Sequence, residues 1–217
     1  MWALTPSMSV TAALPPVVVF DLDGTLWNPE MYQLWGSGGA PFRHAGSSPT
    51  GHVVDKKGNK VDLIGDTREV LASLIPAVAS GVTCLAVAST CDEPEWAREL
   101  LHLFRITNTD SATHVPLMSL FKGPVAIYHA PSKVEHFTEI QELTGVPFHD
   151  MVFFDNQRNN IDAVSRLAVH CVYCPEGLTR HYWDQGVDMW TRGQASAPRG
   201  GHRARDTAAT AAGSGRL

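Results

Sequence analysis

Short apolar runs alternate with amphipathic segments along most of the chain. Five runs are almost continuously apolar, as strands buried on both faces of a sheet are. They predict strands at residues 17–21, 83–89, 126–128, 151–155 and 169–173. Between them, apolar residues recur at helical spacing, which predicts helices at residues 67–80, after residue 94, from 132 to 145 and near 159–167. This alternation is typical of an α/β fold, a parallel sheet covered by helices.

Residues 28–65 interrupt this alternation. Their segment HVVDKKGNKVDL places a Lys-Gly-Asn turn between two stretches that alternate apolar and polar residues, which predicts a β-hairpin. Because the segment follows the first strand, we expect a small flap over that strand's end. Pro76 lies inside the first predicted helix, where we expect a kink or an early end. No structure is predicted for residues 107–123.

The two ends of the chain lack these patterns. Residues 1–15 are expected to form a loose leader, and residues 194–217, rich in Ala, Gly, Ser and Arg, a disordered tail. The length of 217 residues, with 44% hydrophobic and 18% charged residues, suits a single domain with a real core. We therefore expect one domain over residues 16–193, with the flap at about 28–65.

The net charge and the cysteine content indicate which binding partners and which cellular compartment to expect for this protein. The net charge is −5, made up of +3 in residues 194–217 and −8 in the remainder, which argues against a nucleic-acid partner. No apolar run approaches the ~20 residues of a membrane span, and residues 1–16 carry no Lys or Arg, unlike a secretory signal. Four cysteines are too few for a disulfide framework. We expect a cytoplasmic monomer that does not bind membranes.

Polar residues stand where the predicted strands end. Asp21 ends the first strand and Asp23 follows it, Ser89 ends the second strand, Asp155 ends the fourth, and Lys133 opens the helix after the third. Taken singly, each has an ordinary explanation as a turn, a cap or a solvated surface residue. In parallel sheets, however, these ends meet at one edge, where ligands bind. Three carboxylates buried together need a cation, and Mg²⁺ prefers carboxylate and phosphate oxygens.

The order of these residues resembles a known superfamily. FDLDGT is similar to the nucleophile motif of the haloacid dehalogenase superfamily, and the succession of Ser, Lys and Asp resembles its other motifs. The blocks DLDGTLW, SKVEHF and TGVPFHDMVFFDNQRNNI, together with the short hairpin insertion, resemble the eukaryotic magnesium-dependent phosphatases of that superfamily over about residues 15–178. The resemblance implies a Rossmann-like sheet with a hairpin flap and no large cap domain. It also implies a Mg²⁺-dependent phosphatase acting on phosphomonoesters, either phosphotyrosine-like groups on proteins or small sugar phosphates.

The resemblance also assigns roles to the catalytic residues. Asp21 would attack phosphorus and form an aspartyl-phosphate, while Asp23 would act as general acid and base and bind the metal through its backbone carbonyl. Asp155 would complete the metal ligands. The backbone N–H groups that follow Asp21, beginning with Leu22, would form an anion nest.

Three more residues would contact the phosphate or the substrate. Ser89 would hydrogen-bond a phosphate oxygen, Lys133 would offset the charge of nucleophile and phosphate, and Thr90 would face the substrate. Thr90 and Asn156 depart from the family pattern, which tends to have Arg and a second acidic residue at these two positions. The departures leave open a phosphate-binding member with impaired catalysis as the alternative function.

Other members of the superfamily fit the sequence less well. A dehalogenase needs no acid for its leaving group, so the presence of Asp23 argues against this activity. A P-type pump needs membrane spans. A sugar-phosphate mutase normally needs a large helical cap, whereas residues 28–65 hold only a hairpin.

Overall fold

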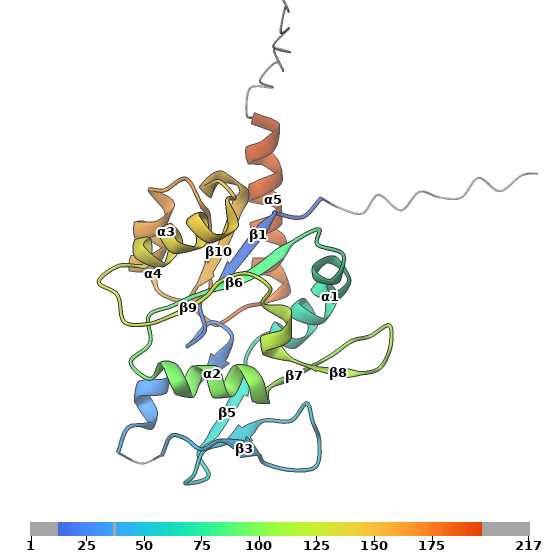
Figure 1. The fold of residues 1–217 in the computed structure, drawn as a ribbon, viewed down its shortest axis with the longest axis vertical. Helices are drawn as coiled ribbons and strands as arrows, with labels where there is room; N and C mark the ends of the chain where they lie inside the picture. Colours follow the sequence, from blue (N-terminus) through green and yellow to red (C-terminus); the bar gives the residue numbers. More distant parts are fainter. Residues whose placement is uncertain (1–12, 37, 197–217) are drawn as a thin grey trace, which may run out of the picture.

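The structure, a computed structural model, describes residues 13–36 and 38–196 (Figure 1). Its centre is a five-stranded sheet in the order β11-β10-β1-β6-β9, in which all neighbouring strands are parallel. The strands are β1 (Val17–Phe20), β6 (Cys84–Ser89), β9 (Val125–Ile127), β10 (Met151–Asp155) and β11 (His170–Tyr173). Their ends agree with the predicted strands to within one residue, so the predicted α/β fold with a parallel sheet is confirmed.

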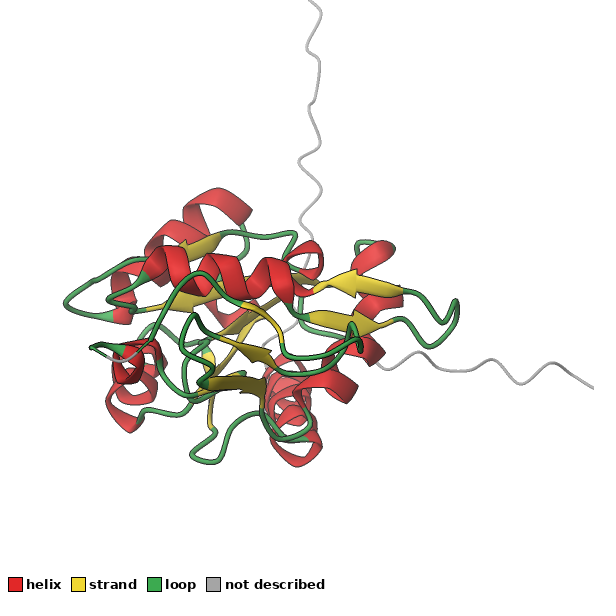
Figure 2. Ribbon diagram, turned by 90° about the horizontal axis from the view of Figure 1, so that it is seen from below, coloured by secondary structure: helices red, strands yellow, loops and turns green. Residues whose placement is uncertain are grey.

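Helices cover both faces of this sheet (Figure 2). They are α1 (Thr67–Ala79), α2 (Pro94–Leu103), α3 (Lys133–Thr144), α4 (Arg158–Ser165) and α5 (Arg180–Ser196). Successive side chains of a strand point to opposite faces, so Val18 packs in one core with α1 and α5, whereas Val17 packs in a second core with α3 and α4. The sheet is thus apolar on both faces, and polar side chains gather beyond its carboxyl edge.

The four predicted helices are present. Helix α1 continues through Pro76 to Ala79, so the early end expected at Pro76 does not occur. Helix α3 begins after Ser132, whose hydroxyl accepts a hydrogen bond from the backbone N–H of Val134 at 3.2 Å, and it ends at Gly145 in the left-handed conformation (φ 68°). Both ends of α3 follow the usual capping rules, which place Lys133 in the first turn.

The flap is larger than the predicted hairpin. The hairpin itself is confirmed, because β4 (Val53–Val54) and β5 (Lys60–Leu63) pair antiparallel. Two further short strands, β2 (Trp27–Asn28) and β3 (Arg43–His44), extend it to four strands in the order β2-β5-β4-β3. The 3₁₀ helix η1 (Met31–Leu34) lies between β2 and β3. This flap occupies the lower part of Figure 1, next to α2.

The turn of the hairpin is fixed by Asp55. This residue is fully buried, and its carboxylate accepts backbone hydrogen bonds from Gly39, Lys57 and Asn59, each at 2.8 Å. Burial by itself raises the pKa of Asp55, but the hydrogen bonds that it accepts outweigh burial and hold its pKa below the ordinary value. The flap therefore has its own polar anchor.

Two parts of the described chain differ from the sequence analysis or were left unassigned by it. A second hairpin, formed by β7 (Arg105–Thr107) and β8 (His114–Pro116), begins just before residues 107–123 and continues into them, where the 3₁₀ helix η2 (Leu117–Leu120) follows it. Helix α5 was not predicted, and its last residues, 194–196, belong to the segment assigned to the tail. The remainder of that tail, and residues 1–12 of the predicted leader, lie outside the described residues.

Helix α5 escaped prediction because its buried stripe includes glycine. Trp183, Gly186 and Trp190 face the core, and a Cβ atom added at Gly186 would lie 2.7 Å from Cζ of Phe154 on β10. Glycine weakens a helix, but here it allows close contact between helix and sheet. None of the helices in the described ranges is long and apolar enough to cross a membrane.

Substitution of Gly186 tests this packing. We expect Gly186→Ala to lower the free energy of unfolding by about 1–3 kcal/mol through overpacking, although alanine raises helix propensity by about 1 kcal/mol. Gln185→Ala, at the exposed neighbouring position, is the control and should change stability little. Urea denaturation measures both values, and a stabilised Gly186→Ala would show that α5 can move away from the sheet.

Candidate active site

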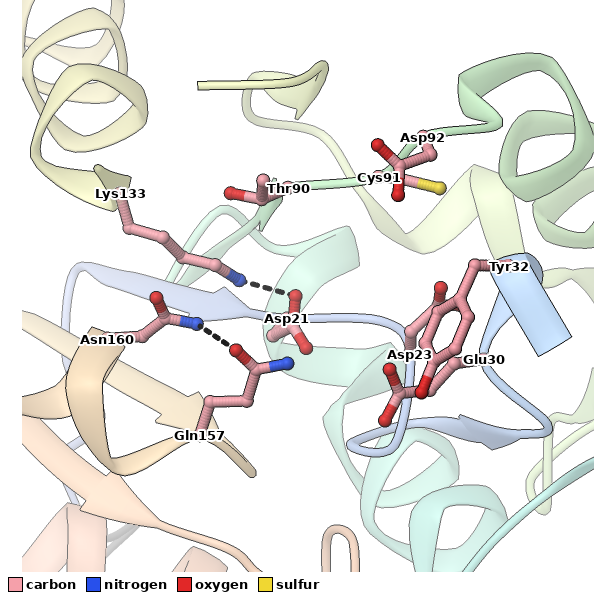
Figure 3. A pocket seen from close by; sticks show the side chains of 10 residues that line it. All are labelled: Asp21, Asp23, Glu30, Tyr32, Thr90, Cys91, Asp92, Lys133, Gln157 and Asn160. Carbon is pink, nitrogen blue, oxygen red and sulfur yellow. Dashed lines mark hydrogen bonds and ion pairs between the residues drawn. The ribbon is translucent and has the colours of Figure 1, made fainter. Parts of the chain in front are cut away.

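A pocket lies at the carboxyl edge of the sheet, next to η1 of the flap (Figure 3). Its lining comes from the loops after β1 and β6, from η1 and the residue before it, and from the first turns of α3 and α4. The lining residues are Asp21, Asp23, Glu30, Tyr32, Thr90, Cys91, Asp92, Lys133, Gln157 and Asn160. The topology therefore brings together Asp21, Asp23, Thr90 and Lys133 from the sequence analysis.

Lys133 is the central cation of this site. Its side chain is almost completely buried, and its ammonium group donates hydrogen bonds to Oδ1 of Asp21 and to the carbonyl oxygen of Ala88 at 2.7 Å. It also lies 2.9 Å from Oδ2 of Asp155. Burial by itself lowers the pKa of Lys133, but the charges of Asp21 and Asp155 outweigh burial and raise it. The lysine is therefore held in its charged form.

The two carboxylates that flank Lys133 leave the site negatively charged. Asp155 is fully buried and Asp21 is 5% exposed. Burial, followed by the nearby charge of Asp21, raises the pKa of Asp155 to about 6, although Lys133 opposes this shift. Asp155 also accepts hydrogen bonds from the backbone N–H of Gln157 at 2.6 Å and from the Asn160 amide at 3.0 Å. One ammonium group thus faces two buried carboxylates, and the three groups together keep a net negative charge.

The carboxyl group of Asp23 points toward the flap. Its Oδ1 accepts a hydrogen bond from Nε1 of Trp27 at 2.6 Å, and its Oδ2 accepts one from the backbone N–H of Met31 at 2.8 Å. Burial is the main cause that raises the pKa of Asp23 to about 7, and the charge of Asp21 adds to it. A carboxyl group with this pKa can both donate and accept a proton near neutral pH.

The loop from Asp21 to Thr25 is held in one conformation. Gly24 has φ +72°, and a Cβ atom there would overlap the side-chain amide of Asn156. The Thr25 hydroxyl lies 3.3 Å from Oδ2 of Asp21 and accepts a hydrogen bond from the backbone N–H of Asn156 at 3.0 Å. Asn156 therefore packs against the loop instead of lining the pocket.

Three oxygen groups in the site suit a hard divalent cation. They are the carboxylates of Asp21 and Asp155 and the carbonyl oxygen of Asp23, which accepts none of the hydrogen bonds found among the described residues. Within residues 13–36 and 38–196, no group of three His, Cys, Asp or Glu side chains is placed to hold a metal. The Asp23 carbonyl can supply a protein oxygen in addition to the carboxylates, and Mg²⁺ usually keeps several waters. Asp155 is not among the residues that line the pocket, and its carboxylate already contacts the backbone N–H of Gln157, the Asn160 amide and Lys133.

Cys91 also lines the pocket. Burial, followed by the charge of Asp23, raises the pKa of its thiol to about 12. At neutral pH this cysteine is therefore an uncharged thiol, and the thiolate is the nucleophilic form. The site does not suit a reaction with a cysteine nucleophile.

Ser89 and Leu22 lie deeper than the pocket lining. Ser89 is 1% exposed, and its hydroxyl has no hydrogen-bond partner among the described residues. Leu22 is fully buried, and its backbone N–H and that of Asp23 donate no hydrogen bond to other described groups. The roles in phosphate binding expected for both residues stay predictions.

The sequence analysis missed several lining residues. Gln157 and Asn160 follow Asp155 in the first turn of α4, a position that the strand-end argument could have found. Glu30 and Tyr32 come from the flap, and no periodic pattern of hydrophobic residues in that segment predicts that they reach the pocket. Their position depends on the turn that follows Asp23.

Comparisons with known proteins identify relatives of this chain. The sequence model of the family described as Acid Phosphatase matches residues 13–193. A magnesium-dependent phosphatase 1 from Homo sapiens is 34% identical over 185 residues, which are 84% of this chain and 91% of that protein. A HAD-like hydrolase superfamily protein from Schizosaccharomyces pombe is 33% identical over 71% of this chain and 83% of its own length.

Solved structures are more distant. A HAD-superfamily hydrolase from Ehrlichia chaffeensis covers 83% of this chain and 98% of its own, with a TM-score of 0.48 and 14% identity, which is too low to bear on function. The assignment depends on the match to the family and on the two sequence relatives. The chain belongs to the Acid Phosphatase family of the haloacid dehalogenase superfamily.

Proposed function

We propose that this protein is a Mg²⁺-dependent phosphatase that hydrolyses phosphomonoesters through an aspartyl-phosphate on Asp21. The observation that carries the proposal is the pairing of two different carboxyl groups in one pocket. Asp21 is held by the ammonium group of Lys133, whereas Asp23 has a pKa of about 7. A reaction that needs both a nucleophile and a proton donor can divide these roles between them.

The first step forms the covalent intermediate. An oxygen of Asp21 attacks phosphorus while the bond to the leaving oxygen breaks, and the carboxyl group of Asp23 donates a proton to that oxygen. Lys133 and the Thr25 hydroxyl fix the orientation of Asp21 through the contacts described above. The charge of Lys133 also stabilises the negative charge that develops on the phosphoryl oxygens.

The second step restores the enzyme. The Asp23 carboxylate takes a proton from a water molecule, whose oxygen attacks phosphorus and releases inorganic phosphate and the Asp21 carboxylate. The backbone N–H groups of Leu22 and Asp23, together with the Ser89 hydroxyl, lack acceptors among the described residues. We assign them to the phosphate oxygens.

The metal site is assigned to the same edge. Asp21, Asp155 and the carbonyl oxygen of Asp23 would hold Mg²⁺, the ion named in the description of the human relative. When bound, Mg²⁺ would neutralise negative charge on the phosphoryl oxygens. The substrate classes that we assign are phosphotyrosine-like groups and small sugar phosphates.

Removal of the metal or of one ligand tests the cofactor. We expect no hydrolysis of p-nitrophenyl phosphate in excess EDTA. Asp155→Ala should weaken the apparent affinity for Mg²⁺ by at least about 10-fold, as measured by titrating activity with Mg²⁺. Asp162→Ala, an exposed residue of α4, is the matched control. Full activity in EDTA would contradict a metal-dependent reaction.

Leaving groups of different quality test the assignment of Asp23. Asp23→Asn should slow the phosphorylation of Asp21 by an alkyl phosphate about 10²–10⁴-fold, and by p-nitrophenyl phosphate far less, because p-nitrophenolate departs without a proton. Hydrolysis of the intermediate still needs a base, so rapid-quench experiments should show a burst of p-nitrophenol. Asp110→Asn, in an exposed loop, is the control. Equal losses for both substrates would mean that Asp23 is not the acid.

The raised pKa of Asp23 predicts a pH dependence. Its proton is retained until the pH reaches about 7, and the protonated form is the donor, so phosphorylation by an alkyl phosphate should slow as the pH rises above this value. With p-nitrophenyl phosphate the rate of phosphorylation should fall much less over the same pH range, because its leaving group needs no proton. Single-turnover rates between pH 5 and 9 measure it. If the alkyl phosphate reacts faster above the pKa, the donor is another group.

A further inference from the structure

The pocket has two distinct sides (Figure 3). Lys133, Gln157 and Asn160 lie on one side of Asp21, whereas Asp23, Glu30 and Tyr32 lie together on the other. In the proposed function, on which this inference rests, Asp23 donates a proton to the leaving oxygen. The leaving group must therefore lie on the side of Asp23. The residues beside Asp23 are then the ones that contact it.

Tyr32 is the large side chain on that side. It lines the pocket and is 48% exposed, so a face of its ring is available to a ligand. Its hydroxyl makes no hydrogen bond to the described residues, so both the hydroxyl and the ring face are available to a ligand. Aromatic rings bind other rings by stacked or edge contacts, in addition to burying apolar area.

The ring is fixed relative to Asp23. Tyr32 belongs to η1, and the first N–H group of η1, that of Met31, donates to Oδ2 of Asp23. Tyr32 also packs edge-on against Trp35, with ring centroids 6.3 Å apart and an interplanar angle of 70°. The indole N–H of Trp35 donates to Glu93 before α2 at 2.8 Å. The ring is thus tied to the proton donor at one end and to α2 at the other.

Charge on this side limits what the ring can accept. Glu30 lies beside Tyr32, and Asp92 lies on the rim nearby. Glu30 forms no ion pair within the described residues, and the one lysine of the pocket is already in contact with Asp21 and Asp155. Asp92 lies 3.4 Å from Nδ1 of His129, so Glu30 is the carboxylate whose like charge an anionic substituent on the leaving group would meet.

We propose that Tyr32 is the specificity-determining residue for the leaving group, and that it selects phosphomonoesters whose leaving group carries an uncharged ring. The shared chemistry is a flat or apolar ring face next to the ester oxygen, which both an aryl group and a hexose provide. Acetyl phosphate has no ring and should depend little on Tyr32.

The test compares substrates in three variants with Mg²⁺ present. For Tyr32→Ala, kcat/KM should fall about 10-fold for a ring-bearing ester and stay within about 2-fold for acetyl phosphate. Phenyl phosphate and glucose 6-phosphate are the two ring-bearing substrates. If kcat/KM falls for only one of them, that result identifies whether Tyr32 contacts an aryl or a carbohydrate ring. Tyr32→Phe keeps the ring and should behave as the unchanged protein. Tyr182→Ala on α5, remote from the pocket, controls for the loss of a tyrosine.

The outcomes separate this inference from the proposed function. An equal loss for phenyl phosphate, glucose 6-phosphate and acetyl phosphate in Tyr32→Ala would overturn the role of the ring, and so would no loss for either ring. If the unchanged protein turned over none of the three, the proposed function itself would fail, and this inference with it. Retained turnover of acetyl phosphate shows that the variant is folded.

A second experiment tests the role of the Glu30 charge. We expect Glu30→Gln to raise kcat/KM for 4-carboxyphenyl phosphate relative to phenyl phosphate by about 3- to 10-fold, because one like charge is removed. Glu142→Gln, an exposed position near the end of α3, is the matched control and should leave the ratio unchanged. A ratio that does not respond to Glu30→Gln would overturn the selection against charged rings.

Discussion

The ion triad of Lys133, Asp21 and Asp155 is the interaction on which the rest of the site depends. It joins the ends of β1 and β10 to the first turn of α3, and the contact with the carbonyl of Ala88 adds β6. Charges buried to this degree cost several kcal/mol each unless they are paired. Removal of Lys133 would leave two buried carboxylates without a cation, whereas removal of either aspartate would leave one ion pair. The triad therefore makes the alignment of three strands a condition for burying the charges.

The same triad also separates the chemistry of the two neighbouring carboxyl groups. Asp21 lies against the ammonium group of Lys133, whereas Asp23 is turned toward Trp27 and Met31 and away from Lys133. Two residues apart in sequence, they therefore have different electrostatic surroundings. The flap supplies both hydrogen-bond donors to Asp23, so the orientation of this carboxyl group depends on the flap.

The parallel sheet and the cluster of charged residues at its edge could be predicted from the sequence, because burial strongly restricts which residues can stand at these positions. A buried parallel strand must be apolar throughout, and ionisable groups such as Asp21, Asp155 and Lys133 stand out where such strands end. Helix α5 was missed because Gly186 lowers the helix propensity of its segment. Glycine stands there because the helix packs closely against Phe154. Tyr32 was missed because its position depends on hydrogen bonds between η1 and the loop after β1. Hydrogen bonds of this kind between separate segments produce no periodic pattern in the sequence.

The interlock between Gly24 and Asn156 restricts how these two positions can change. Any side chain at position 24 would overlap the Asn156 amide, and the positive φ of Gly24 adds a backbone cost for most residues. A side chain at position 24 therefore needs the Asn156 side chain to rotate away or to be replaced by a smaller one. The two positions are coupled through this contact, so we expect them to vary together among related sequences.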